Sequence, residues 1–179
     1  MFRPAVDKDV EAIASIYNEI FDAEEKGLLT TGWIRGIYPT RKTAQEAIDA
    51  REMIVEDIQG TIVASGRINT NQMPEYAMVS WKYDAGDMEV LVLHTLTVSR
   101  KAEGRGYGTE FIRYYEKMAA ERGAPAVRID TNAKNRNARR LYAYLGYREA
   151  GVVQTVFNGI PNVSLVLLEK KILPFDQNR

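Results

Sequence analysis

The run Val90–Val98 (VLVLHTLTV) constrains the fold of this chain more than any other segment. Its nine residues all favour β-strands, and none carries a formal charge at neutral pH. A strand that is apolar along its whole length is covered on both faces, so it belongs in the middle of a sheet with further layers on each side. The run therefore predicts an α/β domain built around this strand.

The remaining sequence supplies the other elements of such a domain. Gln59-Gly60 indicates a hairpin turn, and Thr43–Glu46 has the spacing of a helix capping box. We expect residues 22–40 to be irregular and residues 70–87 to form a loop. Strands are predicted at 2–6, 53–58, 61–69, 90–98, 126–131, 147–157 and 163–171, and helices from Asp7 to about 21, near 44–48, at 107–122 and at 135–145. Without a repeat or a linker, residues 1–179 are predicted to be one domain, with a loose tail at 173–179.

Composition and charge exclude several kinds of protein. The 179 residues include no Cys and one His, which rules out disulfides, thiol nucleophiles and zinc sites with Cys or several His ligands. Lys+Arg and Asp+Glu each number 24, so we expect no nucleic-acid partner. The start of the chain lacks a signal-peptide pattern, and Gly151–Leu168 is interrupted by polar residues. We therefore expect a cytoplasmic protein that neither binds a membrane nor holds a metal.

A glycine-rich loop follows the central strand. Glu103–Thr109 (EGRGYGT) lies between that strand and a predicted helix, with basic residues at Arg100, Lys101 and Arg105. Backbone N–H groups at such a turn, together with the helix N-terminus, can enclose a phosphate, although a plain tight turn has the same composition. A dinucleotide site is an alternative because Asp130 follows at a strand end, but the G-x-G-x-x-G spacing is not met.

Two motifs resemble the GNAT superfamily of acetyl-CoA-dependent N-acetyltransferases. Leu96-Thr97-Val98 followed by Gly104–Gly108 is similar to the acetyl-CoA motif of that family. Asn135–Ala138, with Leu141-Tyr142 and Leu145–Tyr147, is similar to its second motif. The resemblance implies a mixed, largely antiparallel sheet of about six to seven strands flanked by about four helices. It places the cofactor half of the domain at about 88–147.

The resemblance also implies roles for individual residues. Tyr142 matches the general acid that protonates the departing thiolate, and the N–H of Leu96 would polarise the thioester carbonyl. Glu103 departs from the family's preference for Gln or Arg, so we expect its carboxylate to point away or to pair with a neighbouring cation. The residues expected to bind acetyl-CoA are Leu96, Thr97, Val98, Glu103, Gly104, Arg105, Gly106, Tyr107, Gly108, Thr109, Asn135 and Tyr142.

The base that deprotonates the amine has two candidates. Strand alternation predicts that His94 shares a face with Val92, Leu96 and Val98, and family members that acetylate arylalkylamines carry a His at this position. A hydrogen-bonded core histidine is the competing interpretation. Glu89, at the entrance to the strand, is the alternative base, although a solvated strand end explains it better.

The acceptor amine is expected to enter between residues 23–40 and 70–88. Trp33 and Tyr38, together with Trp81 and Tyr83, would supply an aromatic wall, and Glu24, Glu25, Asp84 and Asp87 would attract a cation. Lys134, Arg136, Arg139 and Arg140 form a basic cluster that would attract the cofactor's 3′-phosphate or an acidic partner, or simply face solvent.

With no Cys available for an acyl-enzyme, we expect direct transfer from acetyl-CoA to a small-molecule or peptide amine in a ternary complex. A homodimer is compatible with this prediction. A non-catalytic acyl-CoA-binding module and a dinucleotide-dependent enzyme are the alternatives.

Overall fold

The computed structural model describes residues 1–83 and 85–173, and its core is a single seven-stranded sheet. The strand order is β1-β2-β3-β4-β5-β7-β6, and every neighbouring pair is antiparallel except β4 and β5. The strands are β1 Phe2–Pro4, β2 Met53–Ile58, β3 Thr61–Asn69, β4 Leu91–Val98, β5 Ala126–Asn132, β6 Arg148–Phe157 and β7 Ile160–Lys171. The predicted central strand is the fourth of seven. Asp84 and, beyond Leu173, the predicted tail lie outside the described residues.

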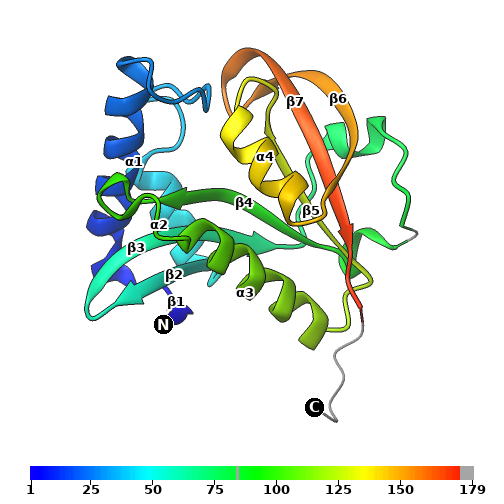
Figure 1. Ribbon diagram of the computed structural model, residues 1–179, viewed down its shortest axis with the longest axis horizontal. Coiled ribbons are helices and arrows are strands. Elements are labelled where there is room, and N and C mark those ends of the chain that lie inside the picture. Colours follow the sequence, from blue (N-terminus) through cyan, green and yellow to red (C-terminus); the bar gives the residue numbers. More distant parts are fainter. Residues whose placement is uncertain (84, 174–179) are drawn as a thin grey trace.

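Four α-helices cover the sheet in two pairs (Figure 1). α1 (Val10–Glu25) and α2 (Arg41–Asp49) pack with β2 and β3 around Ile13, Tyr17 and Met53. α3 (Tyr107–Glu121) and α4 (Arg136–Tyr144) pack on the other face around Phe111, Tyr115 and Leu93. The second of these clusters covers one face of the apolar central strand, through Leu91 and Leu93.

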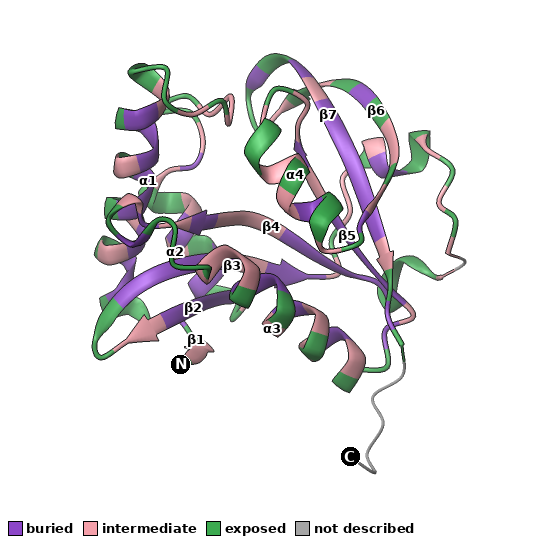
Figure 2. Cartoon of the chain, in the orientation of Figure 1, coloured by how far each residue is buried: buried purple, intermediate pink, exposed green. Residues whose placement is uncertain are grey.

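A third apolar cluster lies under the chain that joins β3 to β4 instead of under an α-helix. Tyr76 and Trp81 from this connection pack against Val92, Val163 and Leu165 of the sheet. The connection contains two short 3-10 helices, Pro74–Met78 and Asp87–Glu89, and lies beside β6 at the right of Figure 1. Figure 2 shows the buried residues that run along β7 beneath it. This part of the sheet is therefore covered by polar loop chain as well as apolar side chains.

The helix ends differ from the sequence prediction at two places. Asp7 begins a 3-10 turn (Asp7–Asp9) and does not cap α1, because the cap position falls on Asp9, whose carboxylate is bound by Arg3 at 2.6 Å. α1 then continues to Glu25 and ends at Gly27, whose φ of 70° suits a residue without a side chain. The irregular segment predicted to start at residue 22 therefore starts four residues later.

The second helix begins earlier than predicted. The side chain of Thr40 accepts a hydrogen bond from the N–H of Thr43, and Thr43 Oγ1 accepts one from the N–H of Thr40. This reciprocal pair starts α2 at Arg41, one turn before the predicted Thr43–Glu46 box. Similarly, the last hairpin turns on Asn158-Gly159 alone, both with positive φ, so β7 starts at Ile160 and not at Val163. The predicted Gln59-Gly60 hairpin is confirmed.

A bulge in β4 reverses the side-chain alternation of the central strand. His94 pairs with Arg67 and Thr97 pairs with Ser65, so β4 has one residue more than β3 between these pairs. Thr95 absorbs the extra residue with a φ of 52°. Leu96 and Val98 consequently pack on the α3/α4 face, beside Leu93. The predicted common face of His94, Leu96 and Val98 is therefore wrong, since His94 lies before the bulge.

Candidate active site

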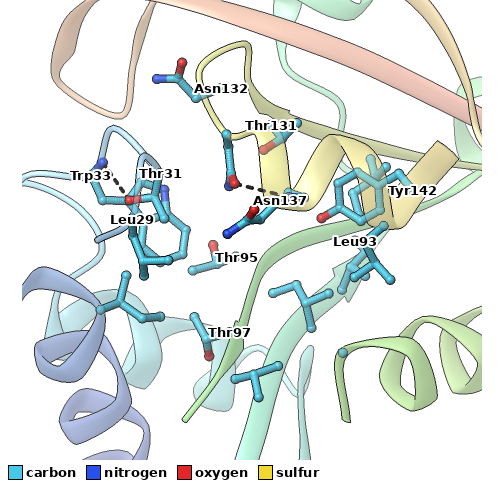
Figure 3. A pocket seen from close by; sticks show the side chains of 18 of the residues that line it. Leu29, Thr31, Trp33, Leu93, Thr95, Thr97, Thr131, Asn132, Asn137 and Tyr142 are labelled. Atoms are coloured by element: carbon cyan, nitrogen blue, oxygen red, sulfur yellow. Dashed lines mark hydrogen bonds between the residues drawn. The ribbon is translucent and has the colours of Figure 1, made fainter. Parts of the chain in front are cut away.

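The parallel strands β4 and β5 separate along their length and leave a cavity between them. They pair only over Leu91–Leu93 and Val127–Ile129. Beyond Leu93 the two strands diverge, and a cavity of about 380 Å³ fills the opening. Figure 3 shows Thr31 and Trp33 on one side of it, and Asn137 and Tyr142 on the other. The β5-facing edge of residues 95–98 therefore has no strand partner and borders this cavity.

Nearly all of the predicted cofactor-binding residues meet at one end of the cavity. Arg105 is the exception, because it does not line the cavity. The predicted residues that do line it are Leu96, Thr97, Val98, Glu103, Gly104, Gly106, Tyr107, Gly108, Thr109, Asn135 and Tyr142. The structure thus brings two motifs from different parts of the sequence onto one surface.

The glycine loop presents the N-terminus of α3 to this end of the cavity. Gly104 and Gly106 have φ values of 78° and 87°, which residues with a side chain rarely adopt. Gly106 is the N-cap of α3, so the N–H groups that follow it have no acceptor within the helix. Glu103 forms an ion pair with Arg100 at 2.5 Å, which confirms the expected pairing with a neighbouring cation. The loop can therefore receive an anion despite its carboxylate.

Tyr142 enters the cavity from α4. Asn135 caps this helix, and its Oδ1 accepts a hydrogen bond from the N–H of Ala138 at 3.2 Å. Burial raises the pKa of the Tyr142 hydroxyl above its ordinary value of 10, and the charge of Asp130 raises it further. The phenol is therefore fully protonated at neutral pH and can only donate its proton.

Asp130 is a half-buried carboxyl, which the sequence suggested only for a dinucleotide site. It lines the cavity from β5 and accepts a hydrogen bond from the Tyr76 hydroxyl at 2.8 Å. Burial raises its pKa from 3.8 to about 6, although the bond from Tyr76 acts in the opposite direction. The signal was present in the sequence: β5 reads AVRIDTN, with two charged residues at alternate positions of a strand that is otherwise largely apolar.

Aromatic side chains form the other end of the cavity. The rings of Trp33 and Phe157 each meet the Tyr38 ring edge-on, with centroids 6.1 and 5.5 Å away. The Tyr38 hydroxyl is hydrogen-bonded to Thr95 Oγ1 at the bulge. Trp33 and Tyr38 were predicted, whereas Phe157 comes from β6 and was not. The predicted Trp81 and Tyr83 line a different cavity, described below.

Neither predicted base lines this cavity. His94 Nε2 is 3.0 Å from Asn69 Oδ1, and burial, assisted by the charge of Arg67, lowers its pKa to about 4. Glu89 is exposed, and its carboxylate accepts the N–H of Gly86 at 2.7 Å. His94 is thus a half-buried, hydrogen-bonded residue beside Asn69, and Glu89 an exposed residue just before β4.

Most other charges near the cavity are paired. Glu24 accepts hydrogen bonds from the N–H groups of Thr31 and Gly32 and so fixes the loop that carries Trp33. Glu25 binds Arg35, and Arg139 of the basic cluster binds Glu149 at 2.7 Å. These groups position chain segments, so they are not free to bind an acceptor.

Comparison with known proteins agrees with this geometry. Residues 11–147 match the model of the acetyltransferase (GNAT) family. An acetyltransferase of the GNAT family from Streptococcus agalactiae superposes with a TM-score of 0.79 at 20% identity, covering 96% of this chain and 94% of the other. The ribosomal-protein-S18-alanine N-acetyltransferase of Escherichia coli gives a TM-score of 0.68 at 14% identity, covering 100% and 97%. At these identities the two structures support the fold. The curated proteins contain no match to the sequence. Separately, no described helix is long and apolar enough to cross a membrane.

Proposed function

This chain belongs to the GNAT family of acetyltransferases, and we propose that it transfers the acetyl group of acetyl-CoA directly to a primary amine. The observation that carries the proposal is the meeting of Asp130, Tyr142 and the glycine loop in one cavity. A base, an acid and an anion-binding helix end are the groups that this reaction requires.

The cofactor is proposed to lie along the unpaired edge of β4. Its pyrophosphate would accept hydrogen bonds from the N–H groups at the start of α3, with favourable charge from the helix dipole. The pantetheine amides would pair with the backbone of residues 96–98, which has no strand partner on this side. The N–H of Leu96 would then polarise the thioester carbonyl.

Asp130 is the proposed base in place of His94 and Glu89. An amine enters as its ammonium ion, gives a proton to the Asp130 carboxylate, and attacks the thioester carbon with the freed electron pair. The C–S bond breaks, Tyr142 gives its proton to the departing thiolate, and the proton that the acetylated nitrogen then loses returns to the Tyr142 phenolate. A carboxyl with a pKa of about 6 is largely ionised at pH 7 but more basic than an ordinary aspartate. Tyr142 is buried and Asp130 half-buried, so a bound acceptor would shield both groups from water that competes for these protons.

The acceptor is proposed to have an aromatic or apolar body and no carboxylate next to its amine. Trp33, Tyr38 and Phe157 offer ring surface, and Asp130 offers negative charge to an ammonium group. Among the described residues that line the cavity, the one cation is Arg100, which is paired with Glu103. An acceptor carboxylate would be desolvated without a cation to bind it.

A matched pair of acceptors tests the proposal. Phenethylamine and phenylalanine differ by the carboxylate, and release of CoA is read with a thiol reagent, against which the Cys-free protein gives no background. We expect kcat/KM for phenethylamine to exceed that for phenylalanine by at least about tenfold, because bound phenylalanine would bury a carboxylate that has no cation to pair with. A peptide with a free N-terminal alanine is the third acceptor. Preference for phenylalanine would contradict the acceptor class. Tight acetyl-CoA binding with no turnover of any amine would instead favour a binding module.

A further inference from the structure

A second cavity, of about 700 Å³, lies under the connection between β3 and β4. Its lining includes Gln72, Tyr76, Trp81, Lys82 and Arg128. It is separate from the acetyl-transfer cavity. Tyr76 stands between the two, because it lines the second cavity while its hydroxyl binds Asp130 of the first. Neither the family nor the proposed function assigns a role to this second cavity.

Arg128 is a buried cation in this cavity without a carboxylate partner. Only 3% of its surface is exposed. Its Nη1 donates to the amide oxygen of Gln72, its guanidinium carbon lies 4.0 Å from the centroid of the Trp81 ring, and its Nε has no hydrogen-bond partner. The described residues give it no ion pair. Arginine keeps its charge when buried, so an unpaired guanidinium in a protein interior is costly.

The nearest acidic neighbour on the sheet is already occupied. Glu169 lies directly across from Arg128 on β7. Its carboxylate binds Arg148 and accepts hydrogen bonds from the N–H groups of Lys82 and Tyr83, at 2.8 and 3.3 Å. Glu169 therefore anchors the strand connection to the sheet and leaves the guanidinium of Arg128 available to the cavity.

We propose that this cavity binds a small monocarboxylate through Arg128. A carboxylate matches the planar guanidinium and would supply the partner that the buried charge lacks. Lys82 adds positive charge, whereas Glu169, Asp87 and Asp130 nearby oppose a second negative charge on the ligand. Met73, Pro74, Val79 and Tyr83 add apolar side chains to a lining that is polar elsewhere. Because these side chains can contact an apolar body and the nearby carboxylates oppose a second negative charge, a monocarboxylate with a compact apolar body fits better than a phosphate.

Binding of benzoate, hexanoate, benzamide and inorganic phosphate to the intact protein, measured by isothermal titration calorimetry, tests this proposal. We expect saturable binding of benzoate or hexanoate with a Kd of about 1 mM or tighter. Benzamide, which has the same shape as benzoate without the charge, is expected to bind at least about tenfold more weakly, as loss of a charge-assisted pair requires.

Two variants locate the binding site. Arg128→Gln removes the charge, and Gln72→Glu places a built-in carboxylate beside Arg128. Each is expected to weaken benzoate binding at least about tenfold. If Arg128→Gln fails to fold, Gln72→Glu still decides, because it adds the missing partner; Tm is measured as well, since this change also replaces the hydrogen bond from Gln72 Nε2 to Asp87 Oδ1 with two neighbouring carboxylates. Gln154→Glu on the exposed face of β6 is the matched control and should change neither quantity. Equal binding of benzoate and benzamide, preference for phosphate, absence of saturable carboxylate binding, or full binding by Gln72→Glu would overturn the proposal.

Discussion

Replacing Asp130 with Asn separates the chemical role of this carboxyl from its effect on stability. Asn has the same shape and its amide oxygen can still accept the hydrogen bond from Tyr76, so the cavity should be preserved. A positioned general base contributes about 10²–10⁴-fold to the rate, and we expect Asp130→Asn to lower kcat by that factor at pH 7. Wild-type kcat/KM should fall below pH 6, as Asp130 becomes protonated, and the variant should lose this decline.

The same substitution should stabilise the fold. The pKa of Asp130 is raised from 3.8 to about 6, so folding disfavours its charged form, and this loss of stability develops as pH rises from 3.8 through 6. At pH 7 the full cost is about 3 kcal/mol, which the uncharged Asn avoids; at pH 4.5 the same shift gives about 1 kcal/mol. Urea unfolding at the two pH values measures both differences.

A stable but inactive variant cannot be explained by misfolding, which makes this pair of measurements decisive. Asp49→Asn is the control, because Asp49 is exposed and lies outside the cavity. It should change neither kcat nor the pH profile. The reasoning is refuted if Asp130→Asn keeps its rate within a few-fold at pH 7, or if the decline below pH 6 remains in the variant.

Three further substitutions test the other assignments. Tyr142→Phe should lower kcat about 10²-fold or more while the Kd for acetyl-CoA, measured by calorimetry, stays within about twofold; a parallel loss of affinity would indicate a packing role. Gly106→Ala should cost about 1–2 kcal/mol in urea unfolding, because its φ of 87° is strained for alanine although no atom lies within 4 Å of the new methyl group, and it should weaken acetyl-CoA binding. His94→Gln can keep a hydrogen bond to Asn69 and should change kcat/KM by less than about threefold, since a hydrogen-bonded residue outside the cavity takes no proton; a loss comparable to that of Asp130→Asn would restore His94 as the base.

The sequence was sufficient to predict most of the residues that line the cavity near α3 and α4, because this part of the cavity is built from local signals. Gly104 and Gly106 report a turn that needs positive φ, and Asn135 reports a helix start seven residues before Tyr142. Such signals depend on neighbours in the chain, so they can be recognised without knowledge of the tertiary structure. The chain fold then brings both segments to the separation of β4 and β5.

The sequence predicts that His94 faces the same side as Leu96 and Val98, and this prediction fails because it depends on which face of a strand a residue occupies. One extra residue at Thr95 moves Leu96 and Val98 to the face opposite His94, and threonine at a positive φ has no sequence signal. Phe157 was missed for a related reason, since its approach to Tyr38 follows from how the β6–β7 hairpin lies over the cavity. Whether His94 and Phe157 lie at the cavity depends on contacts between segments that are far apart in the sequence.

Each of the two proposals depends on a charged residue of β5. Arg128 and Asp130 lie on one face of the strand, and both carry pKa shifts caused first by burial, each toward the neutral form. On the opposite face, Val127 and Ile129 pack in the apolar cluster under α3 and α4. Loop chain can cover buried charges because Gln72, Tyr76 and Trp81 bring polar atoms or a ring face to them, whereas an apolar helix face would not. The proposed chemistry is therefore confined to one face of the strand: a substitution at Val127 should act on unfolding alone, whereas one at Asp130 should act on both turnover and unfolding.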